Sequence, residues 1–255
     1  MTDEKLKQKY GAVILLDALG ASDYSDVKIK KFLSARTEIN SIILNLSKEL
    51  KGMEESTKFN MPSIYTFGDT IITTVELNDQ KYIAAHIIGI SLLMRRYLFH
   101  SLAAGILFRG AFSIGSYIED SDSNTVMGEA VTDAVAWYAK FDWMGISSTP
   151  KTNSVLEYHF SGREKSLDDI HYMHSFAVPL KNGSTFNLYT ISWPAAFFNK
   201  DFLKIAGKDN PRKWFLELLQ NLPVPKGTEM KYENTKAYFT YVEHKLADKP
   251  IKQTS

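Results

Sequence analysis

Gly11-Ala-Val-Ile-Leu-Leu-Asp-Ala-Leu-Gly20 places one carboxylate, Asp17, directly after an uninterrupted apolar run. A continuous run of this kind is typical of a strand that is buried on both faces of a sheet. We therefore expect a central strand with Asp17 at its exit. The small residues that follow, Gly20, Ala21 and Ser22, predict a turn that leads into a helix.

A second carboxylate, Asp69, lies between two runs of β-branched and aromatic residues, 64–67 and 71–75. Gly68 supplies the positive φ that a two-residue hairpin turn requires, so Asp69 is expected at a hairpin tip. If this hairpin pairs beside the first strand, Asp17 and Asp69 converge, and a cation is needed to neutralise their repulsion. Hard oxygen ligands select Mg²⁺ or Mn²⁺. Each aspartate taken alone is also explained by local backbone hydrogen bonds at strand ends and turns.

The remaining hydrophobic patterns predict how the sheet is completed. Apolar residues recur at three- and four-residue spacing over 29–50, which indicates an amphipathic helix. A second helix is expected between a cap at Asn78-Asp79 and a break at Gly105, and a strand follows over 106–115. The order β-α-β-β-α-β is that of a ferredoxin-like core with helices on one face of the sheet, so the fold class is α+β.

Extra strands and helices are expected after this core. A helix is predicted from 127 to about 140, then a strand over 143–146. Segments 176–180 and 186–193 form a hairpin around the turn Asn182-Gly183, since Asn-Gly is a strong hairpin signal. Two further helices, 211–221 and 230–245, complete the chain.

Composition narrows the classes of function. The 255 residues suffice for one main domain, and 30 basic against 29 acidic side chains give a net charge of +1, so no global field favours nucleic acid. There is no cysteine, which excludes disulfides and thiolate metal sites. The charged N-terminus has no apolar core of a secretion signal, so we expect a cytoplasmic protein. His and Arg residues interrupt the apolar stretch 82–107, so direct membrane contact is not expected.

Four segments, 17–22, 67–69, 108–115 and 127–134, resemble in this order the class III nucleotidyl cyclase catalytic domain. The resemblance is closer to the small pyrimidine cyclases of the bacterial Pycsar antiphage systems. In this family an acid and a following glycine form the first metal motif, Gly-Asp the second, and an Arg-Gly strand and a glycine-initiated helix come next. The resemblance covers about 11–193, which is expected to be the catalytic domain. Residues 194–255 are expected to form a helical extension packed on the same domain.

The resemblance implies an activity and a set of ligands. UTP or CTP would be converted to the 3′,5′-cyclic monophosphate and pyrophosphate, a second messenger in antiphage defence that a downstream cyclic-nucleotide-sensing effector detects. Two Mg²⁺ or Mn²⁺ ions per site would be held by Asp17, Asp69 and the carbonyl of Ala18. The backbone of Leu19 and the following residues through Ser22 would cradle the phosphates. The family acts as a head-to-tail homodimer with the active sites at the interface, so a homodimer is expected.

Departures from the family motif bear on specificity and rate. Purine cyclases carry a lysine and an acid where this chain has Tyr65 and Thr125. The two side chains that bind the edge of adenine are therefore missing, and a smaller base is favoured. The usual Asn and Arg of the next helix fall at Thr132 and Ala136. Arg109 either replaces these two residues in stabilising the charge of the transition state or is a structural arginine within the sheet.

Three alternatives and one further residue complete the sequence-based predictions. Lys181 lies where the family tends to keep a triphosphate-binding lysine, although lysine before a hairpin turn is also ordinary surface chemistry. The loss at Ala136 favours a catalytically inactive nucleotide-binding relative, whereas retention of both aspartates argues against it. A purine nucleotide cyclase is the second alternative. A diguanylate-type cyclase is the third, and its doubled hairpin motif is missing here.

Overall fold

Four antiparallel strands form one side of the sheet: β1 (Lys9–Ala18), β2 (Ser63–Phe67), β3 (Thr70–Glu76) and β4 (Phe108–Asp120). They belong to a computed structural model that describes residues 7–21, 25–53, 60–77, 79, 82–161, 167, 171–222 and 224–248. The strand order is β2-β3-β1-β4-β6-β8-β7, with β5 paired to β4. The predicted ferredoxin-like βαββαβ core is therefore confirmed, and β1 is its buried central strand.

The helices and outer strands follow in chain order. Within the core the helices are α1 (Asp26–Met53) and α2 (Ile83–Ala103). Beyond the core come β5 (Thr125–Met127), α3 (Glu129–Tyr138), β6 (Gly145–Ser148), α4 (Pro150–Phe160), β7 (Met173–Pro179), β8 (Thr185–Ile191), the 3₁₀ helix η4 (Trp193–Phe198), α5 (Lys200–Ile205), α6 (Pro211–Gln220) and α7 (Glu229–Asp248). The mixed sheet has one parallel pair in this path, β4 with β6.

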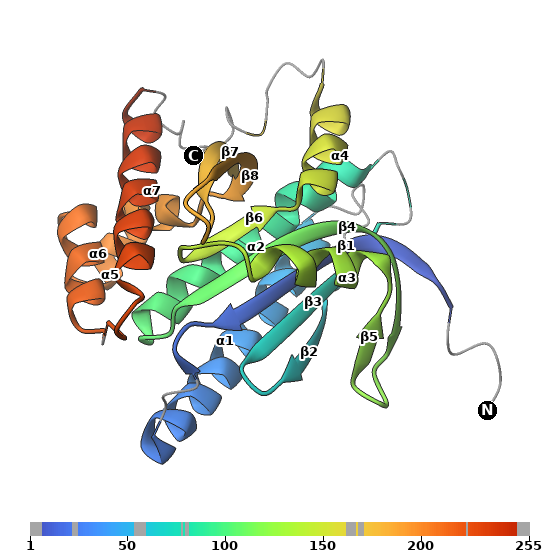
Figure 1. Ribbon diagram of the computed structural model, residues 1–255, viewed down its shortest axis with the longest axis horizontal. Helices are drawn as coiled ribbons and strands as arrows, with labels where there is room; N and C mark the ends of the chain where they lie inside the picture. Colours follow the sequence, from blue (N-terminus) through green and yellow to red (C-terminus); the bar gives the residue numbers. More distant parts are fainter. Residues whose placement is uncertain are drawn as a thin grey trace.

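Two faces of the sheet are covered differently, with α1 and α2 on one face and α3 on the other (Figure 1). Successive residues of a strand point to opposite faces. Phe108 of β4 therefore contacts the α1–α2 layer, with its ring 6.3 Å from Phe32 and 5.7 Å from Tyr97. Its neighbour Arg109 points the other way and lies over Tyr138 of α3. The α3 face is consequently the face that carries Asp17 of β1 and Arg109 of β4.

Aromatic side chains attach the C-terminal helices to the rest of the chain. The Phe99 ring of α2 lies 5.0 Å from Phe197 of η4 and 5.4 Å from Trp214 of α6. Trp143, just before β6, packs edge-on against Tyr238 of α7 at 4.7 Å. Such pairs stabilise a fold by about 0.5–1.5 kcal/mol each beyond area burial. Because these rings join both sides of residue 193, the division into a catalytic domain and an extension stays a prediction.

Several local features differ from the sequence predictions. Elements β5, α4, η4 and α5 were not predicted, although Thr149 as N-cap and Pro150 at the first position are recognised helix-start signals. Helix α2 starts after Tyr82 without a side-chain cap, so the Asp79 cap is wrong; the Tyr82 amide donates instead to the Asp79 carbonyl. Asn78 lies outside the described residues. No helix of the described part is long and apolar enough to cross a membrane.

Candidate active site

The two predicted acids lie at the same end of the sheet. Asp17 pairs in register with Thr70 of β3, and the amide of the next residue, Ala18, donates to the carbonyl of Asp69 at 3.3 Å. Gly68 has a φ of 60°, and Arg36 of α1 donates to its carbonyl at 2.6 Å, which fixes the β2–β3 turn. The hairpin therefore pairs beside β1 and brings Asp69 to the strand exit that carries Asp17.

Arg109 joins Asp17 from the neighbouring strand. The two residues are register partners, and Nη2 of Arg109 lies 2.9 Å from Oδ2 of Asp17. The arginine side chain is 9% exposed and the aspartate side chain 20%. Nη1 of Arg109 donates to the carbonyl of Phe141 at 3.3 Å, and the guanidinium carbon of Arg109 lies 5.4 Å from the centre of the Tyr138 ring. The buried Nε has no hydrogen-bond partner among the described residues, so this arginine keeps one donor for a further acceptor.

Electrostatic effects link the remaining charged residues to this cluster. Burial raises the pKa of Tyr138, and the charges of Asp17 and Asp69 raise it further against the opposing effect of Arg109. Both acids therefore act on one phenol. Burial lowers the pKa of Lys181, and the charge of Arg109 lowers it further, while Asp17 acts in the opposite direction. The charges of Asp17 and Arg109 therefore act on both Tyr138 and Lys181, and the charge of Asp69 acts on Tyr138.

The donor set fits a cation that arrives together with phosphate. No group of three or more His, Asp or Glu side chains in the described residues could hold a metal by itself. Mg²⁺ usually keeps several waters and binds through one or two carboxylates plus substrate phosphates. Asp17 and Asp69 provide two carboxylates from adjacent segments, and Ala18 provides a backbone carbonyl between them.

The turn after β1 corrects part of the phosphate prediction. The amide of Leu19 donates to the carbonyl of Leu107 at 2.8 Å, so it is not available to a phosphate. Gly20 follows with a φ of 75°, a conformation that glycine adopts at no steric cost. Ala21 continues the turn, whereas Ser22 lies outside the described residues. Of the predicted cradle, Gly20 and Ala21 remain.

A second polar cluster surrounds Glu119, which the sequence analysis missed. Lys9 donates to Glu119 Oε1 at 2.7 Å, and Thr74 donates to Oε2 at 2.6 Å. Burial raises the pKa of Tyr65 to about 12, with a further contribution from the Glu119 charge. Tyr65 is 3% exposed, so it fills volume and does not present a free ring for stacking. The exposed edge of this cluster lines a cavity of about 300 Å³.

Gly11 on β1 leaves room for the side chain of Tyr117 on β4. A Cβ on Gly11 would lie 2.3 Å from the Val75 carbonyl oxygen and 3.0 Å from the ring of Tyr117, so a larger residue is excluded. The alternation Tyr117, Glu119 on β4 was the available sequence signal, because residues two apart share a face. Thr125, the other predicted base-reading residue, donates to the Ser123 carbonyl at 3.1 Å within the β4–β5 turn.

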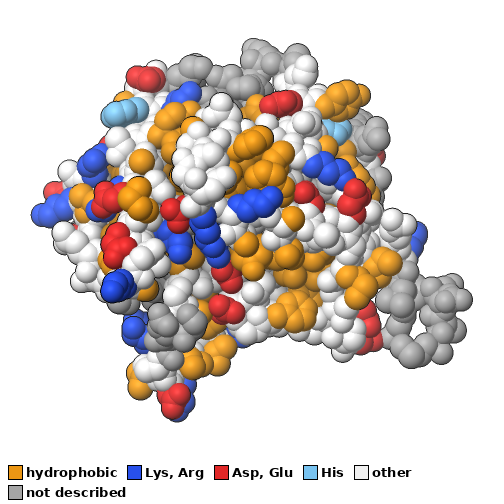
Figure 2. All heavy atoms as spheres, in the orientation of Figure 1, with side chains coloured by type: hydrophobic (Ala, Val, Ile, Leu, Met, Phe, Trp, Pro, Cys, Tyr) orange, Lys and Arg blue, Asp and Glu red, His pale blue; other side chains and the backbone are white. Residues whose placement is uncertain are grey.

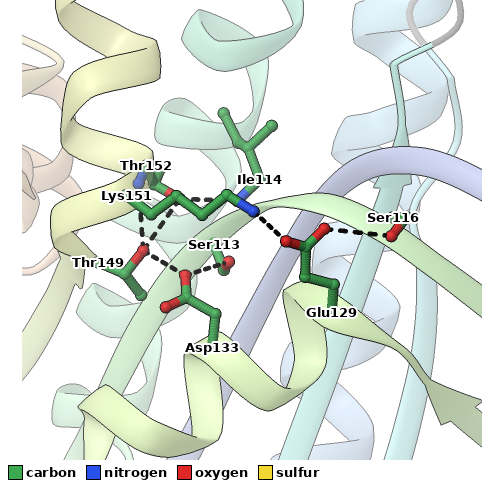
Figure 3. Close-up of polar contacts among 8 residues, drawn as sticks. All are labelled: Ser113, Ile114, Ser116, Glu129, Asp133, Thr149, Lys151 and Thr152. Atoms are coloured by element: carbon green, nitrogen blue, oxygen red, sulfur yellow. Dashed lines mark hydrogen bonds and ion pairs between the residues drawn. The ribbon is translucent and has the colours of Figure 1, made fainter.

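Helix α3 is fixed to the sheet through Asp133 (Figure 3). Its Oδ2 accepts from Ser113 of β4 at 2.7 Å and from Thr149, the N-cap of α4, at 2.5 Å. Glu129, one turn earlier, pairs with Lys151. The predicted positions Thr132 and Ala136 lie on the exposed side of the helix. Their side chains are therefore open to solvent in the single chain.

Comparison with known proteins gives structural similarity only. No family model matches the chain, and no curated protein matches its sequence. Similar structures include the adenylyl cyclase CyaB from P. aeruginosa, with 13% identity, TM-score 0.46, and coverage of 73% of this chain and 95% of that chain. The catalytic core of a rhodopsin-guanylyl cyclase with converted specificity, in complex with ATPαS, shows 11% identity, TM-score 0.46, and coverage of 74% and 98%. A bacterial light-regulated adenylyl cyclase shows 13% identity, TM-score 0.41, and coverage of 84% and 98%.

Proposed function

We propose that this protein is a nucleotide cyclase that converts UTP or CTP into the 3′,5′-cyclic monophosphate and pyrophosphate. The observation that carries the proposal is the meeting of Asp17 and Asp69 at one sheet end. Arg109, whose Nε has no hydrogen-bond partner among the described residues, pairs with Asp17, and the charges of Asp17 and Arg109 both act on Lys181. Two carboxylates beside a buried arginine suit the binding of a magnesium-bound triphosphate better than they suit a purely structural ion pair.

Each residue has a defined role in this proposal. Arg109 and Lys181 bind phosphate oxygens, and Asp17, Asp69 and the Ala18 carbonyl would hold two Mg²⁺ or Mn²⁺ ions. Bound cations would acidify the substrate's 3′-hydroxyl and neutralise charge on the leaving group. The 3′-oxygen forms a bond to the α-phosphorus, the bond to the bridging oxygen of pyrophosphate breaks, and the hydroxyl proton passes to water. Positioning and electrostatics supply most of the rate in such transfers.

Selection of a pyrimidine is proposed from the Glu119 cluster. Tyr65 stands where purine cyclases carry a lysine, and its larger ring fills more of the space for the base, which favours a smaller base. The Glu119 carboxylate can accept a hydrogen bond from the amino group of cytosine or from the N3–H of uracil. Thr125, the first residue of β5, pairs with Asp120, the residue after Glu119. Both UTP and CTP therefore remain within the proposal, and UTP is the first to test.

A homodimer is proposed because of the exposed apolar side chains around α3. Met127, Val135 and Phe186 are each about half exposed, and Figure 2 shows hydrophobic side chains gathered on this face. A second copy would bury them and bring Thr132 and Ala136 of one chain towards the Asp17 cluster of the other. In bacteria the product would act as a cytoplasmic antiphage second messenger, sensed by an effector protein. This role rests on the resemblance to the Pycsar cyclases.

Product analysis tests the proposed activity. Purified protein is incubated separately with ATP, GTP, CTP and UTP in the presence of Mn²⁺, and cyclic nucleotides are separated chromatographically. We expect cyclic UMP or cyclic CMP, and Asp69→Asn should abolish either. A purine cyclic nucleotide as the main product would overturn the pyrimidine assignment. No cyclic product from any substrate would overturn the enzyme assignment.

A second candidate function is an inactive, nucleotide-binding relative. Ala136 favours it, because this exposed position has no group that could donate to a transition state. Calorimetric titration with UTP and CTP distinguishes the two. Saturable nucleotide binding without turnover would support the second candidate, whereas turnover that requires Asp69 would reject it.

A further inference from the structure

A cavity of about 520 Å³ lies behind the turn that follows β1. Its walls are the Leu19–Gly20 turn, the first turns of α1, the C-terminal end of α2 and the loop between α6 and α7. None of the acids in the Asp17 cluster lines it. Its volume falls within the range of about 300–1,000 Å³ typical of small-molecule sites. The C-terminal helices therefore close a space that the βαββαβ core alone leaves open.

The charges around this cavity are of one sign. Lys28 and Lys31 lie one turn apart on α1, and Lys231 lies in the first turn of α7. Among the described residues that line the cavity there is no Asp or Glu, and none of the three lysines forms an ion pair with a described residue. Most of the other lining side chains are apolar, including Phe32 and Leu222. Three ammonium groups without an ion-pair partner among the described residues, beside an apolar space, suit a ligand with an anionic head and an apolar body.

We propose that this cavity binds a small amphipathic anion, with a carboxylate or phosphate head at Lys28, Lys31 and Lys231 and a hydrocarbon or aromatic body against the apolar wall. A nucleotide is a poor candidate for the occupant, because the wall offers apolar side chains where a ribose and a base need polar partners. The cavity shares the Leu19–Gly20 turn with the proposed nucleotide site, but none of Asp17, Asp69, Arg109 and Lys181 lines it, so the proposal does not depend on cyclase activity.

Occupancy of the cavity is coupled to the end of β1. A Cβ on Gly20 would lie 3.4 Å from the ring of Pro225, so the α6–α7 loop rests directly on the turn after Asp17. The charge of Lys231 also reaches Lys181, where it contributes to lowering the pKa of that side chain. A ligand that holds α1 and α7 together would therefore stabilise the turn that carries Leu19 and Gly20.

Calorimetric titration with decanoate tests the proposal on the full chain. Decyl phosphate serves as the phosphate-headed probe, and decanol as the uncharged body. We expect saturable binding of at least one anion at one molecule per chain, and binding of decanol weaker by about tenfold or more, which corresponds to about 1.4 kcal/mol. The affinity ratio of decanoate to decyl phosphate identifies the preferred head group.

Variants locate the bound anion. Lys31→Glu should weaken the binding by about tenfold or more, whereas Lys30→Glu, an exposed neighbour on the same helix that does not line the cavity, should change it less than about twofold. Leu222→Trp fills the apolar part of the cavity while the lysines stay intact, and it should abolish binding. Circular dichroism verifies that each variant is folded. Absence of saturable binding by both anions, or equal affinity in Lys31→Glu and Lys30→Glu, would overturn the proposal. Displacement of decanoate by UTP in the Asp69→Asn variant would overturn it as well, because the cavity would then belong to a nucleotide site.

Discussion

The Asp17–Arg109 ion pair should be strongly coupled, and its coupling energy can be measured. Removal of one partner from a buried pair costs about 3–5 kcal/mol, because the other charge is left buried and unpaired. Asp17 keeps one-fifth of its side chain exposed, so water compensates part of this cost. We therefore expect Arg109→Met to lower the free energy of unfolding by about 2–3 kcal/mol. For a chain of this size the melting temperature would fall by about 4–12 °C.

A double-mutant cycle isolates the pair from the other contacts of Arg109. Asp17→Asn, Arg109→Met and the double variant are unfolded in urea at neutral pH, followed by tryptophan fluorescence. The double variant should be more stable than additivity predicts by about 1–2 kcal/mol. The exposed pair of Arg212 with Glu243, at 2.6 Å, is the matched control and should couple by less than about 1 kcal/mol. Additivity at Asp17 and Arg109 within about 0.5 kcal/mol would refute the reasoning.

Three further perturbations test the second cluster, α3 and base selection. Burial opposes the ionisation of Glu119, but the hydrogen bonds from Lys9 and Thr74 outweigh it and lower its pKa below 4.5. The ionised Glu119 therefore stabilises the fold above pH 4.5, and this contribution is lost as the pH falls through the folded-state pKa. The difference in free energy of unfolding between wild type and Glu119→Gln should thus become smaller in acid. Urea midpoints whose difference does not change with pH would contradict this. Asp133→Asn should cost about 1.5–3 kcal/mol, because two hydroxyl donors lose a charged acceptor, whereas exposed Glu129→Gln should cost less than about 0.5 kcal/mol by the same unfolding measurement. Tyr65→Ala should reduce the preference for pyrimidine over purine triphosphates more than it affects the Mn²⁺ requirement, and an unchanged ratio of kcat/KM values would discard its role.

The central strand and the hairpin could be predicted because their signals are local. An uninterrupted apolar run indicates a doubly buried strand, and Gly68 supplies the turn that its hairpin requires. The convergence of Asp17 and Asp69 then follows from strand pairing alone. Lys181 was predicted from the resemblance to the cyclase family, and its role as a phosphate ligand stays a prediction.

Features that depend on contacts distant in sequence could not be predicted. Glu119 meets Lys9 and Thr74 from two other strands, and no spacing along the chain reveals that meeting. The Leu19 amide is occupied by Leu107, a pairing that only the completed sheet creates. The cavity beside Gly20 needs α7, which lies more than 200 residues later in the chain. Helix α4, by contrast, has readable start signals at Thr149 and Pro150.

Mn²⁺ binding tests most directly the claim that Asp17 and Asp69 together hold divalent cations. Electron paramagnetic resonance measures free Mn²⁺ during titration of the protein in the presence of a non-hydrolysable UTP or CTP analogue. We predict two bound ions per chain for the wild type and the loss of at least one in Asp17→Asn and in Asp69→Asn. Asp201→Asn, an exposed acid on α5, should bind as the wild type does. Unchanged Mn²⁺ affinity and stoichiometry in both Asp17→Asn and Asp69→Asn would contradict the claim.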